Sequence, residues 1–377
     1  MLTIRSIVTE LQASNAGKHP LELKAVLVGE FPPPAAGMAV QAESLMQGLQ
    51  SLGVAVVPVR VNRHFQGSWT FINRLRGVRG LLRFLAFLVD TRRFRKVDLV
   101  HVFSASGLNY YLYSVTPLLI ARLAGKPCII HYHGGAAEEF FKGRRKLLDW
   151  SMQRAATLVV PSAYLGDIFK RFGFSARIIP NIAGVERFHY REREQAPPHI
   201  IMARNLTATY NIECGVRAFA EMAGEFPEAT LTIAGDGPKR HELERLVEDL
   251  ELQHVSFLGN VPNDQMPRIF EQATLLLNTS NVDNMPGSIL EAYASGLPVV
   301  STAAGGIPYL VKQGETGLLA PVNDHRALAK HLLAIARDQE KGRQLARAGL
   351  ACVTNMTASR ICLDWKDYYE EILETID

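Results

Sequence analysis

The chain has 377 residues, of which 47% are hydrophobic and 21% are charged, and its formal net charge is +4. These values are ordinary for a soluble globular protein, and the length predicts two domains with sizeable cores. No apolar run reaches 18 residues and the N-terminus lacks the pattern of a signal peptide, so a membrane-spanning helix and secretion are not expected.

Other compositional features concern compartment and partners. The four cysteines show no C-x-x-C pairing or metal-ligand spacing, which predicts reduced thiols in a cytoplasmic protein (Cys128, Cys214, Cys352 and Cys362). Residues 1–190 hold 24 Lys and Arg against 11 Asp and Glu, whereas residues 191–377 hold 17 against 26. The basic first half favours an anionic partner, such as a nucleic acid or a membrane surface.

The first half of the chain alternates short apolar runs with helical patterns. We predict strands at the runs that are rich in β-branched residues (24–31, 54–60, 98–103, 127–133, 156–162 and 176–181). These runs are apolar on both faces, as in parallel sheets covered by helices on both sides. The first half is therefore expected to form one doubly wound domain.

The second half repeats the same scheme after a polar, proline-containing linker at 189–198. Five further strands are predicted there (199–204, 229–235, 255–260, 273–280 and 297–302). The final segment, 357–376, is amphipathic, and we expect it to cross back to the first domain. The expected domains are residues 1–190 together with the helix at 357–377, and residues 191–356.

Several familiar nucleotide-site patterns are missing. The run "GDGPKR" after the strand at 229–235 has G-x-G but lacks the third glycine of a dinucleotide fingerprint, which disfavours a dehydrogenase. The sequence contains no P-loop, no D-x-D and no G-x-S-x-G elbow. In doubly wound folds, anions bind at loops that follow strands and open helices, so such loops are the candidate ligand sites.

One such loop is "NVDNMPGSILEAYASGLPVVST", residues 281–302. A helix is expected to begin near Pro286, so that the backbone N–H groups of Gly287, Ser288 and Ile289 are free to bind a diphosphate. Glu291, one turn further along, could accept hydrogen bonds from ribose hydroxyls, while Asp283 lies where an attached sugar would extend. Alternatively, Asp283 or Asn284 caps the helix and Glu291 is a solvated surface residue.

From these motifs, the second half resembles the retaining GT-B glycosyltransferases of family 4. "EAYASGLPVV" and "GGIPYLVKQGETGLLAPVND" are close to that family's pattern, and "LTIAGDGPKRHELERLVEDLELQHVSFLGN" also follows it. The first half matches more weakly, through "PPPAAGMAVQAESLMQGLQSLGVAV", "IIHYHGG" and "ARIIPNIAGVERF". The resemblance covers roughly residues 25–375. It implies an α/β GT-B fold, with two Rossmann-like domains facing across a cleft and the C-terminal helix returning to the first.

The resemblance also implies roles for single residues in the second half. Arg204 in "MARN" matches the arginine that binds the donor phosphates, but the accompanying lysine is replaced by Tyr210. The first glutamate of the E-x7-E pair is Asp283 here, and Glu291 is the second. Val261 and Pro262, in the loop after "FLGN", resemble the segment whose backbone contacts the base.

In the first half, the resemblance assigns two positions. Gly37 matches the glycine that approaches the donor phosphates, although a plain turn is the alternative. His133 in "HYHGG" matches the histidine that contacts the transferred sugar. We expect its neighbour His131 to pack or to form a structural hydrogen bond.

These assignments imply a reaction without a cofactor or a metal. A hexose would leave a UDP- or GDP-linked donor with retention of its anomeric configuration, while Arg204 and the helix N-terminus stabilise the leaving diphosphate. Asp283 would hold the sugar hydroxyls. The acceptor is expected to be a saccharide or a lipid-linked saccharide of bacterial surface polysaccharide or glycolipid synthesis.

A basic segment suggests where the acceptor is presented. Residues 60–96 contain ten Lys and Arg but one acid, Asp90. One helical face is expected to be apolar (Leu75, Val78, Leu82, Leu85 and Val89), with a parallel arginine stripe (Arg76, Arg79 and Arg83) and nearby Trp69 and Phe71. This pattern predicts peripheral contact with an anionic membrane at its inner face, or else an ordinary solvated helix. No nucleic-acid-binding module is apparent.

Two other functions remain open at this point. A sugar-nucleotide epimerase would also use two Rossmann-like domains. A non-catalytic subunit that binds sugar nucleotides would explain the missing lysine at Tyr210.

Overall fold

The computed structural model describes residues 23–33, 37–63, 76–134, 137–143, 145–193 and 197–376. Contacts divide the chain into two compact units. The first unit comprises residues 1–182 and 358–377, and the second comprises residues 183–357. Each unit contains one parallel sheet with its own hydrophobic core.

The first unit is built on a six-stranded parallel sheet in the order β2-β1-β3-β4-β5-β6. Its central strands β3 and β4 are buried at every residue, because helices cover both faces, which is why their sequences are apolar throughout. All six strands predicted in the first half are present (β1 Lys24–Gly29, β2 Ala55–Arg60, β3 Leu99–Ser104, β4 Cys128–Tyr132, β5 Thr157–Val160 and β6 Arg177–Ile178).

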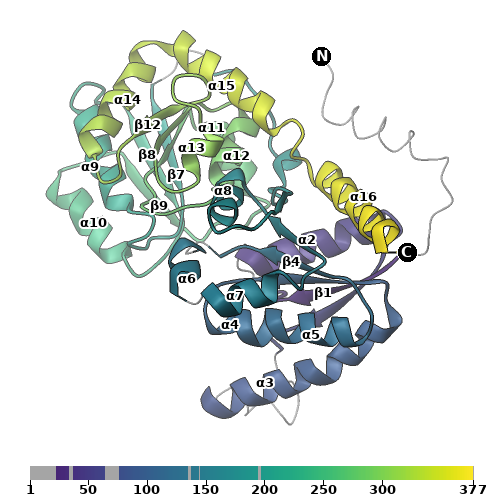
Figure 1. Cartoon of the computed structure of the whole chain (residues 1–377). Coiled ribbons are helices and arrows are strands. Elements are labelled where there is room, and N and C mark those ends of the chain that lie inside the picture. Colours follow the sequence, from purple (N-terminus) through teal and green to yellow (C-terminus); the bar gives the residue numbers. More distant parts are fainter. Residues whose placement is uncertain are drawn as a thin grey trace. The chain divides into compact units, whose positions relative to one another are not determined.

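Helices connect these strands and cover the sheet (Figure 1). They are α2 Gly37–Ser51, α3 Arg76–Asp90, η2 Thr91–Lys96, α4 Leu108–Tyr110, η3 Tyr111–Val115, α5 Thr116–Leu123, α6 Ala137–Gly143, α7 Arg145–Met152, α8 Ala163–Arg171 and α16 Ala358–Ile376. Helix α16 packs against α2. A Cβ at Gly48 of α2 would lie 2.2 Å from the Cys362 Sγ, so a glycine permits this close approach.

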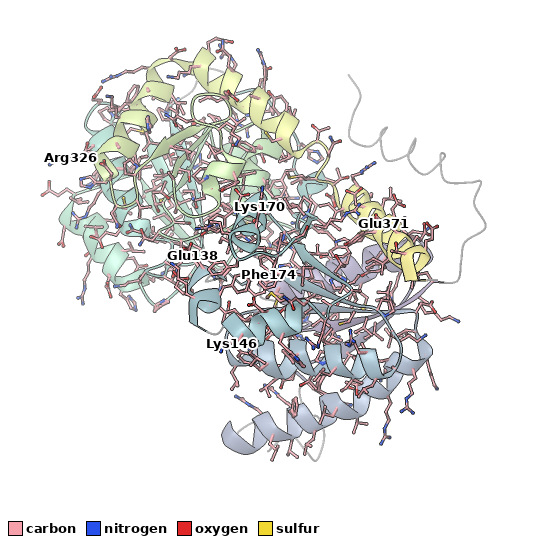
Figure 2. The ribbon with its side chains drawn as sticks, in the orientation of Figure 1. Glu138, Lys146, Lys170, Phe174, Arg326 and Glu371 are labelled. Carbon is pink, nitrogen blue, oxygen red and sulfur yellow. The ribbon has the colours of Figure 1, made fainter. Side chains whose placement is uncertain are left out.

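Side-chain packing around α6 and α8 combines an aromatic cluster with surface ion pairs. Phe141 contacts Phe169 and Phe174, with ring centroids 5.0 and 6.1 Å apart. Glu138 of α6 pairs with Arg171 of α8 at 3.1 Å (Glu138 and Phe174 are labelled in Figure 2). The aromatic contacts bury large apolar surfaces, whereas exposed ion pairs of this kind contribute little stability.

Helix α3 packs on the core through Phe84, Phe87 and Leu88. Leu85 and Val89, which belong to the predicted apolar face, are exposed. That face is therefore open at those two positions, and its contact with a membrane stays a prediction. Trp69, Phe71 and Leu75 lie outside the described residues, as do the side chains of Arg76 and Val78.

The second unit has the sheet order β12-β11-β10-β7-β8-β9, again all parallel. The strands are β7 His199–Ala203, β8 Thr230–Ala234, β9 Val255–Gly259, β10 Leu275–Asn278, β11 Val299–Thr302 and β12 Leu318–Ala320. The helices are η4 Val185–Arg187, α9 Ile212–Ala223, α10 Arg240–Asp249, α11 Met266–Gln272, α12 Gly287–Ser295, α13 Ile307–Leu310, α14 His325–Arg337 and α15 Gln339–Val353.

The prediction of two doubly wound α/β domains is confirmed by these sheets. Strand β12, which pairs with β11 at the edge of the sheet, was not predicted. At three residues it is too short to show a periodic signal. The carboxyl ends of β7 and β10 lie side by side in the middle of the sheet, and the candidate residues of the second unit gather there.

Candidate active site

Arg204 and Asp283 form an ion pair at the carboxyl ends of β7 and β10. The Arg204 Nη2 donates to the Asp283 Oδ2, and the two side chains are only 16% and 13% exposed. Asn278, the last residue of β10, contacts the same guanidinium through its Oδ1, 3.4 Å from the Arg204 Nε. Two residues that are 79 positions apart in sequence are thus joined in one largely desolvated, charge-paired group.

Glycines allow close backbone packing of the two loops that carry this pair. A Cβ at Gly306 would lie 2.0 Å from the carbonyl oxygen of Asn284, and the Gly306 N–H donates to the Asp283 carbonyl at 2.8 Å. On the other side, a Cβ at Gly235 would lie 2.1 Å from the carbonyl oxygen of Arg204. The glycines of "GGIP" and "GDGP" therefore permit close backbone packing around the pair. Packing of this kind is a reason for the glycines of "GDGP" that does not require a dinucleotide site.

Tyr210, which stands where the family has a lysine, lies beside the Arg204–Asp283 pair and supplies no positive charge of its own. The Arg204 Cζ is 4.8 Å from the centroid of the Tyr210 ring, a cation–π distance. The Tyr210 carbonyl also accepts a hydrogen bond from the Thr279 Oγ1 at 2.9 Å. The phenol ring thus supports the guanidinium of Arg204 from its face.

Helix α12 begins at Gly287, and its N-cap residue is Pro286. The Asp283 carboxylate accepts from Arg204 through its Oδ2 and from the Asn284 N–H through its Oδ1, so the alternative of Asp283 as the helix cap is wrong. The expectation of a free N–H is wrong at Ile289, which donates to the Pro286 carbonyl at 3.1 Å.

Three polar groups at the start of α12 lack a partner within the helix. The Ser288 Oγ is buried and has no hydrogen-bond partner within the described parts of the chain. The N–H groups of Gly287 and Ser288 are among those that an α-helix leaves without an internal acceptor. A helix N-terminus with a buried, unpartnered hydroxyl suits an anionic oxygen.

Glu291 lies one turn into α12 and is partly buried. Burial raises the pKa of its carboxyl to about 7, while Arg187 and Arg204 act in the opposite direction. The alternative of a solvated surface glutamate is therefore wrong, because a solvated carboxylate would show no such desolvation. A carboxylate in this setting gains strongly from any ligand hydroxyl that donates to it.

Three polar residues at the strand ends were not singled out from the sequence. Ser280 donates to Asn278 Oδ1 at 3.1 Å, and Asn278 Nδ2 donates to Ser301 Oγ at 2.9 Å. All three side chains are buried. The sequence does mark this place, because "LNTS" ends an apolar strand with consecutive polar residues. It does not show which residues on other strands these side chains contact.

The first unit carries His133 and Gly37. His133 follows β4, and burial lowers the pKa of its imidazole to about 3, so the ring is neutral near neutral pH. Gly37 is the first residue of α2, and a Cβ there would meet no atom within 4 Å, so it is a helix start facing open space rather than a plain turn. The structural hydrogen bond expected for His131 is confirmed, since its Nδ1 is 3.1 Å from the His101 Nε2.

Val261 lies in the loop after β9, at the edge of the second sheet. Strand β8 separates β9 from β7, so Val261 is two strands away from the strand that leads to Arg204. The neighbouring Pro262 carbonyl accepts from the Gln265 N–H at 2.9 Å. This spacing suits a ligand that extends along the carboxyl edge of the sheet.

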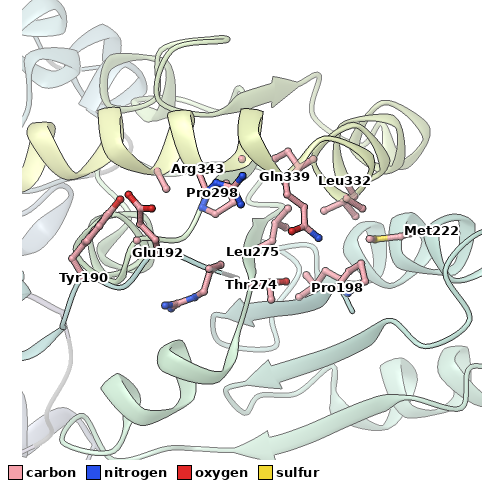
Figure 3. A pocket seen from close by; sticks show the side chains of 17 residues that line it. Tyr190, Glu192, Pro198, Met222, Thr274, Leu275, Pro298, Leu332, Gln339 and Arg343 are labelled. Carbon is pink, nitrogen blue, oxygen red and sulfur yellow. The ribbon is translucent and has the colours of Figure 1, made fainter. Parts of the chain in front are cut away.

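A separate apolar pocket of the second unit opens at the amino ends of the strands (Figure 3). Leu275, at the start of β10, lines it together with Pro198, Met222, Pro298 and Leu332. Ligands of doubly wound sheets bind at the carboxyl ends, so this pocket is not assigned to the candidate active site.

No helix in the described residues is long and apolar enough to cross a membrane. Within the same residues, no three His, Cys, Asp or Glu side chains form a group that could hold a metal ion.

Comparison with known proteins gives matches over most of the chain. The family model "Glycosyl transferase 4-like domain" matches residues 35–182, and "Glycosyl transferases group 1" matches residues 186–351. N-acetyl-alpha-D-glucosaminyl L-malate synthase of Bacillus anthracis is 28% identical over 176 residues, which is 46% of this chain and 45% of that protein. The chain thus spans less than half the length of the first curated relatives that it matches.

A longer alignment and the solved structures extend the likeness. Alpha-monoglucosyldiacylglycerol synthase of Acholeplasma laidlawii is 22% identical over 343 residues, 81% of this chain and 85% of that protein. Sucrose-phosphate synthase from Thermosynechococcus elongatus superposes with a TM-score of 0.71 at 18% identity, over 94% of this chain and 100% of that one. HepE of Anabaena, solved with UDP-glucose, superposes with a TM-score of 0.69 at 17% identity, over 93% and 100%. These structures share the fold.

Proposed function

The chain belongs to the group 1 glycosyltransferases of the GT-B fold, and from that premise we propose that it is a retaining, metal-independent hexosyltransferase. The donor is a UDP- or GDP-linked sugar, and the acceptor is a saccharide or a lipid-linked saccharide. The observation that carries this proposal is the Arg204–Asp283 pair at the carboxyl ends of β7 and β10, beside the N-terminus of α12.

The charges of this group match a nucleotide-sugar donor. The diphosphate is held by the Arg204 guanidinium together with the Gly287 and Ser288 N–H groups and the Ser288 hydroxyl. Glu291 accepts from ribose hydroxyls, which replace the water that burial has removed from its carboxyl. The base extends towards Val261 along the edge of the sheet, and Ile289 stabilises the first turn of α12.

In the proposed reaction, the bond between the anomeric carbon and the diphosphate oxygen breaks. Negative charge develops on the leaving diphosphate, where Arg204 and the helix N-terminus stabilise it. Asp283 and His133 contact hydroxyls of the transferred sugar. The acceptor oxygen forms the new bond on the same face, and the departing diphosphate takes its proton.

A pocket in the first unit suits the acceptor. It lies at the carboxyl ends of β1, β2 and β3, and its lining includes Glu30, Asn62, Arg79, Arg83 and Tyr113. Burial and the neighbouring Arg79 lower the pKa of Arg83, while Tyr113 and Glu30 act against that shift. Two arginines against one carboxylate favour an acceptor that carries an anionic group.

Helix α3 also presents an apolar row on its outer side. Leu81, Leu85 and Val89 follow one another at intervals of four residues and are 61%, 46% and 55% exposed. Exposed basic residues of η2 continue from the same helix (Arg92, Arg93, Arg95 and Lys96). We assign this surface to peripheral contact with an anionic membrane, consistent with a lipid-linked acceptor.

The names of relatives support the same setting. They include an Escherichia coli protein named "Putative colanic acid biosynthesis glycosyltransferase WcaL" and the alpha-monoglucosyldiacylglycerol synthase of Acholeplasma laidlawii. The first name refers to the biosynthesis of colanic acid, and the second to a glucosylated diacylglycerol. We therefore place the acceptor in bacterial surface polysaccharide or glycolipid synthesis.

The test is incubation with a panel of UDP- and GDP-sugars, with and without saccharide and lipid-linked acceptors. Product anomers are read by NMR. Transfer with a retained anomeric configuration is expected. An epimerised sugar nucleotide would indicate an epimerase, tight binding without turnover would indicate a binding subunit, and an inverted product would overturn the retaining mechanism.

A further inference from the structure

Three histidines of the first unit lie next to one another on β3, on β4 and just after β4. His101 and His131 are buried, at 0% and 3% exposure, and both pack against Trp365 of α16, with ring centroids 4.5 and 4.9 Å apart. The ring of His133 follows, 4.0 Å from that of His131. Burial lowers the pKa of each imidazole, so all three are neutral near neutral pH.

Hydrogen bonds join these rings to the C-terminal helix. The Tyr369 hydroxyl of α16 is 2.6 Å from the His101 Nδ1, and the His101 Nε2 is 3.1 Å from the His131 Nδ1. The chain of bonds then stops. The Nε2 atoms of His131 and His133 are buried, and neither has a hydrogen-bond partner within the described residues.

The direction of these bonds follows from a count of protons. If Tyr369 donates to His101, then His101 donates to His131, and one group is left without a partner, the Nε2–H of His131. If the bonds run the other way, the Tyr369 proton and the His131 Nε2 lone pair are both left unpaired among the described residues. Each unsatisfied buried polar group destabilises the folded protein, so the first direction, which leaves fewer of them, is favoured.

We propose that His131 is a second substrate-contacting residue, whose Nε2–H donates to the sugar hydroxyl that also meets His133. Tyr369 and His101 are positioning residues that fix the tautomer of His131. A hydroxyl group suits this place because its oxygen accepts from the His131 Nε2–H, and it pairs with the His133 Nε2 in either tautomer of that ring, as a donor or as an acceptor. The ligand assignment rests on the proposed function, whereas the proton arrangement does not.

The proton arrangement is tested by NMR of the full chain carrying ¹⁵N-labelled histidine, which distinguishes the two neutral tautomers. Protons on Nε2 of His101 and His131 are expected in the wild type. Tyr369→Phe removes the donor to His101 and should give a mixture of tautomers at both rings. A wild-type His131 protonated on Nδ1 would overturn the proposal, whether or not the protein turns over any sugar.

A matched control lies next to Tyr369. Tyr368 is on the same helix, is also buried, and its hydroxyl bonds to the Thr157 Oγ1 instead of a histidine. Tyr368→Phe should leave the histidine tautomers unchanged. Equal tautomer changes in both variants would mean that α16 acts through packing alone, which contradicts the proposal.

The substrate contact is tested by kinetics with the nucleotide sugar that the wild type uses. Tyr369→Phe should lower kcat/KM for the donor roughly tenfold, as expected for a misdirected hydrogen bond, with Tyr368→Phe near wild type. His131→Gln keeps an N–H donor and should retain more activity than His131→Leu. Equal activity of the Gln and Leu variants would overturn the contact. If the wild type turns over no nucleotide sugar, the proposed function fails, while the NMR result still decides the proton arrangement.

Discussion

At the scale of single residues, the Arg204–Asp283 pair determines how the candidate site can work. Both charges are largely removed from water and satisfy each other, and the guanidinium also lies over the Tyr210 ring. Removing one partner leaves the other charge desolvated and unpaired, which is more costly than removing both. Stability and activity can therefore be separated at this pair.

Arg204→Ala is expected to reduce turnover about 10²–10³-fold, because the leaving diphosphate loses its main cation. The same change should lower the melting temperature, since Asp283 is left unpaired. Arg204→Ala combined with Asp283→Asn should recover the melting temperature but not the turnover. Turnover assays and thermal melts of the single and double variants check this, and a loss below tenfold in Arg204→Ala would contradict the role.

Tyr210 is expected to act through its ring and not through its hydroxyl. Tyr210→Phe keeps the ring beneath Arg204 and should stay within about twofold of wild type in kcat/KM for the donor. Tyr210→Leu removes the cation–π contact, which is worth about 1–2 kcal/mol when partly desolvated, and should cost roughly tenfold. If kcat/KM falls as far in Tyr210→Phe as in Tyr210→Leu, the hydroxyl binds the donor directly and the prediction is wrong.

Glu291 carries a prediction about pH. Its folded pKa is raised to about 7 from the ordinary value of 4.5. The folded state then binds more protons than the unfolded state between these values, so its stability falls as pH rises and the full cost, on the order of 3 kcal/mol, is reached above pH 7. Glu291→Gln should therefore raise the melting temperature at pH 8 and change it little at pH 4.

The same variant should weaken donor binding at pH 8. Titration calorimetry with the nucleotide sugar that the wild type uses measures this loss. The affinity of the wild type for that donor should rise as the pH passes 7, because the carboxylate is a better hydrogen-bond acceptor than the carboxylic acid. Unchanged affinity in Glu291→Gln would remove Glu291 from the ribose site.

At the scale of elements, helix α3 carries two different surfaces, one lined by arginines and one apolar, which the sequence analysis treated as a single membrane-contact surface. Arg79 and Arg83 line a pocket at the strand ends, whereas Leu81, Leu85 and Val89 form an exposed row on α3. Arg79 and Arg83 of the predicted arginine stripe therefore line the pocket that we propose for the acceptor, and the apolar row becomes the better candidate for membrane contact. The two surfaces can be tested separately.

Replacing Leu81, Leu85 and Val89 with Gln should weaken binding to anionic vesicles on the order of tenfold, because the apolar surface available for insertion is lost. Arg79→Gln with Arg83→Gln should change vesicle binding less and mainly raise the KM for an anionic acceptor. Sedimentation with anionic and neutral vesicles is the measurement. Vesicle binding that depends only on the arginines, or equal pelleting with both lipids, would reject the apolar row.

At the scale of the whole molecule, each unit has its own sheet and core. The proposed donor residues, apart from Gly37 and His133, lie in the second unit. A ligand that binds only the folded state stabilises it by about 2.7 kcal/mol at a concentration of 100 Kd. UDP or GDP should thus slow amide hydrogen exchange mainly in residues 197–353, with the strongest protection in α12 and the loops after β7 and β10.

Arg204→Ala is the control for that experiment and should lose the protection at the same nucleotide concentration. Protection confined to the first unit would instead place the nucleotide there and reverse the assignment of the two domains. The response to UDP compared with GDP would also identify the base.

Much of the fold could be predicted from the sequence because its signals are local. Eleven of the twelve strands described were predicted from apolar runs bounded by turn residues, and β12 was missed because three residues carry no period. The start of α12 was also predicted correctly, since Pro-Gly before an apolar helix is a strong local pattern.

What only the tertiary structure decided depends on contacts between distant segments. The sequence by itself determined the two doubly wound domains and the family motifs, because periodicity and turn chemistry act over a few residues. It could not show that Arg204 pairs with Asp283, that Gly235 and Gly306 pack against their loops, or that Tyr369 reaches His101 from 268 residues away. Those contacts arise only when parallel strands bring their carboxyl ends together and α16 packs on the first sheet. Burial then shifts the pKa of Glu291 and the three histidines, and no sequence pattern records how much water a side chain loses.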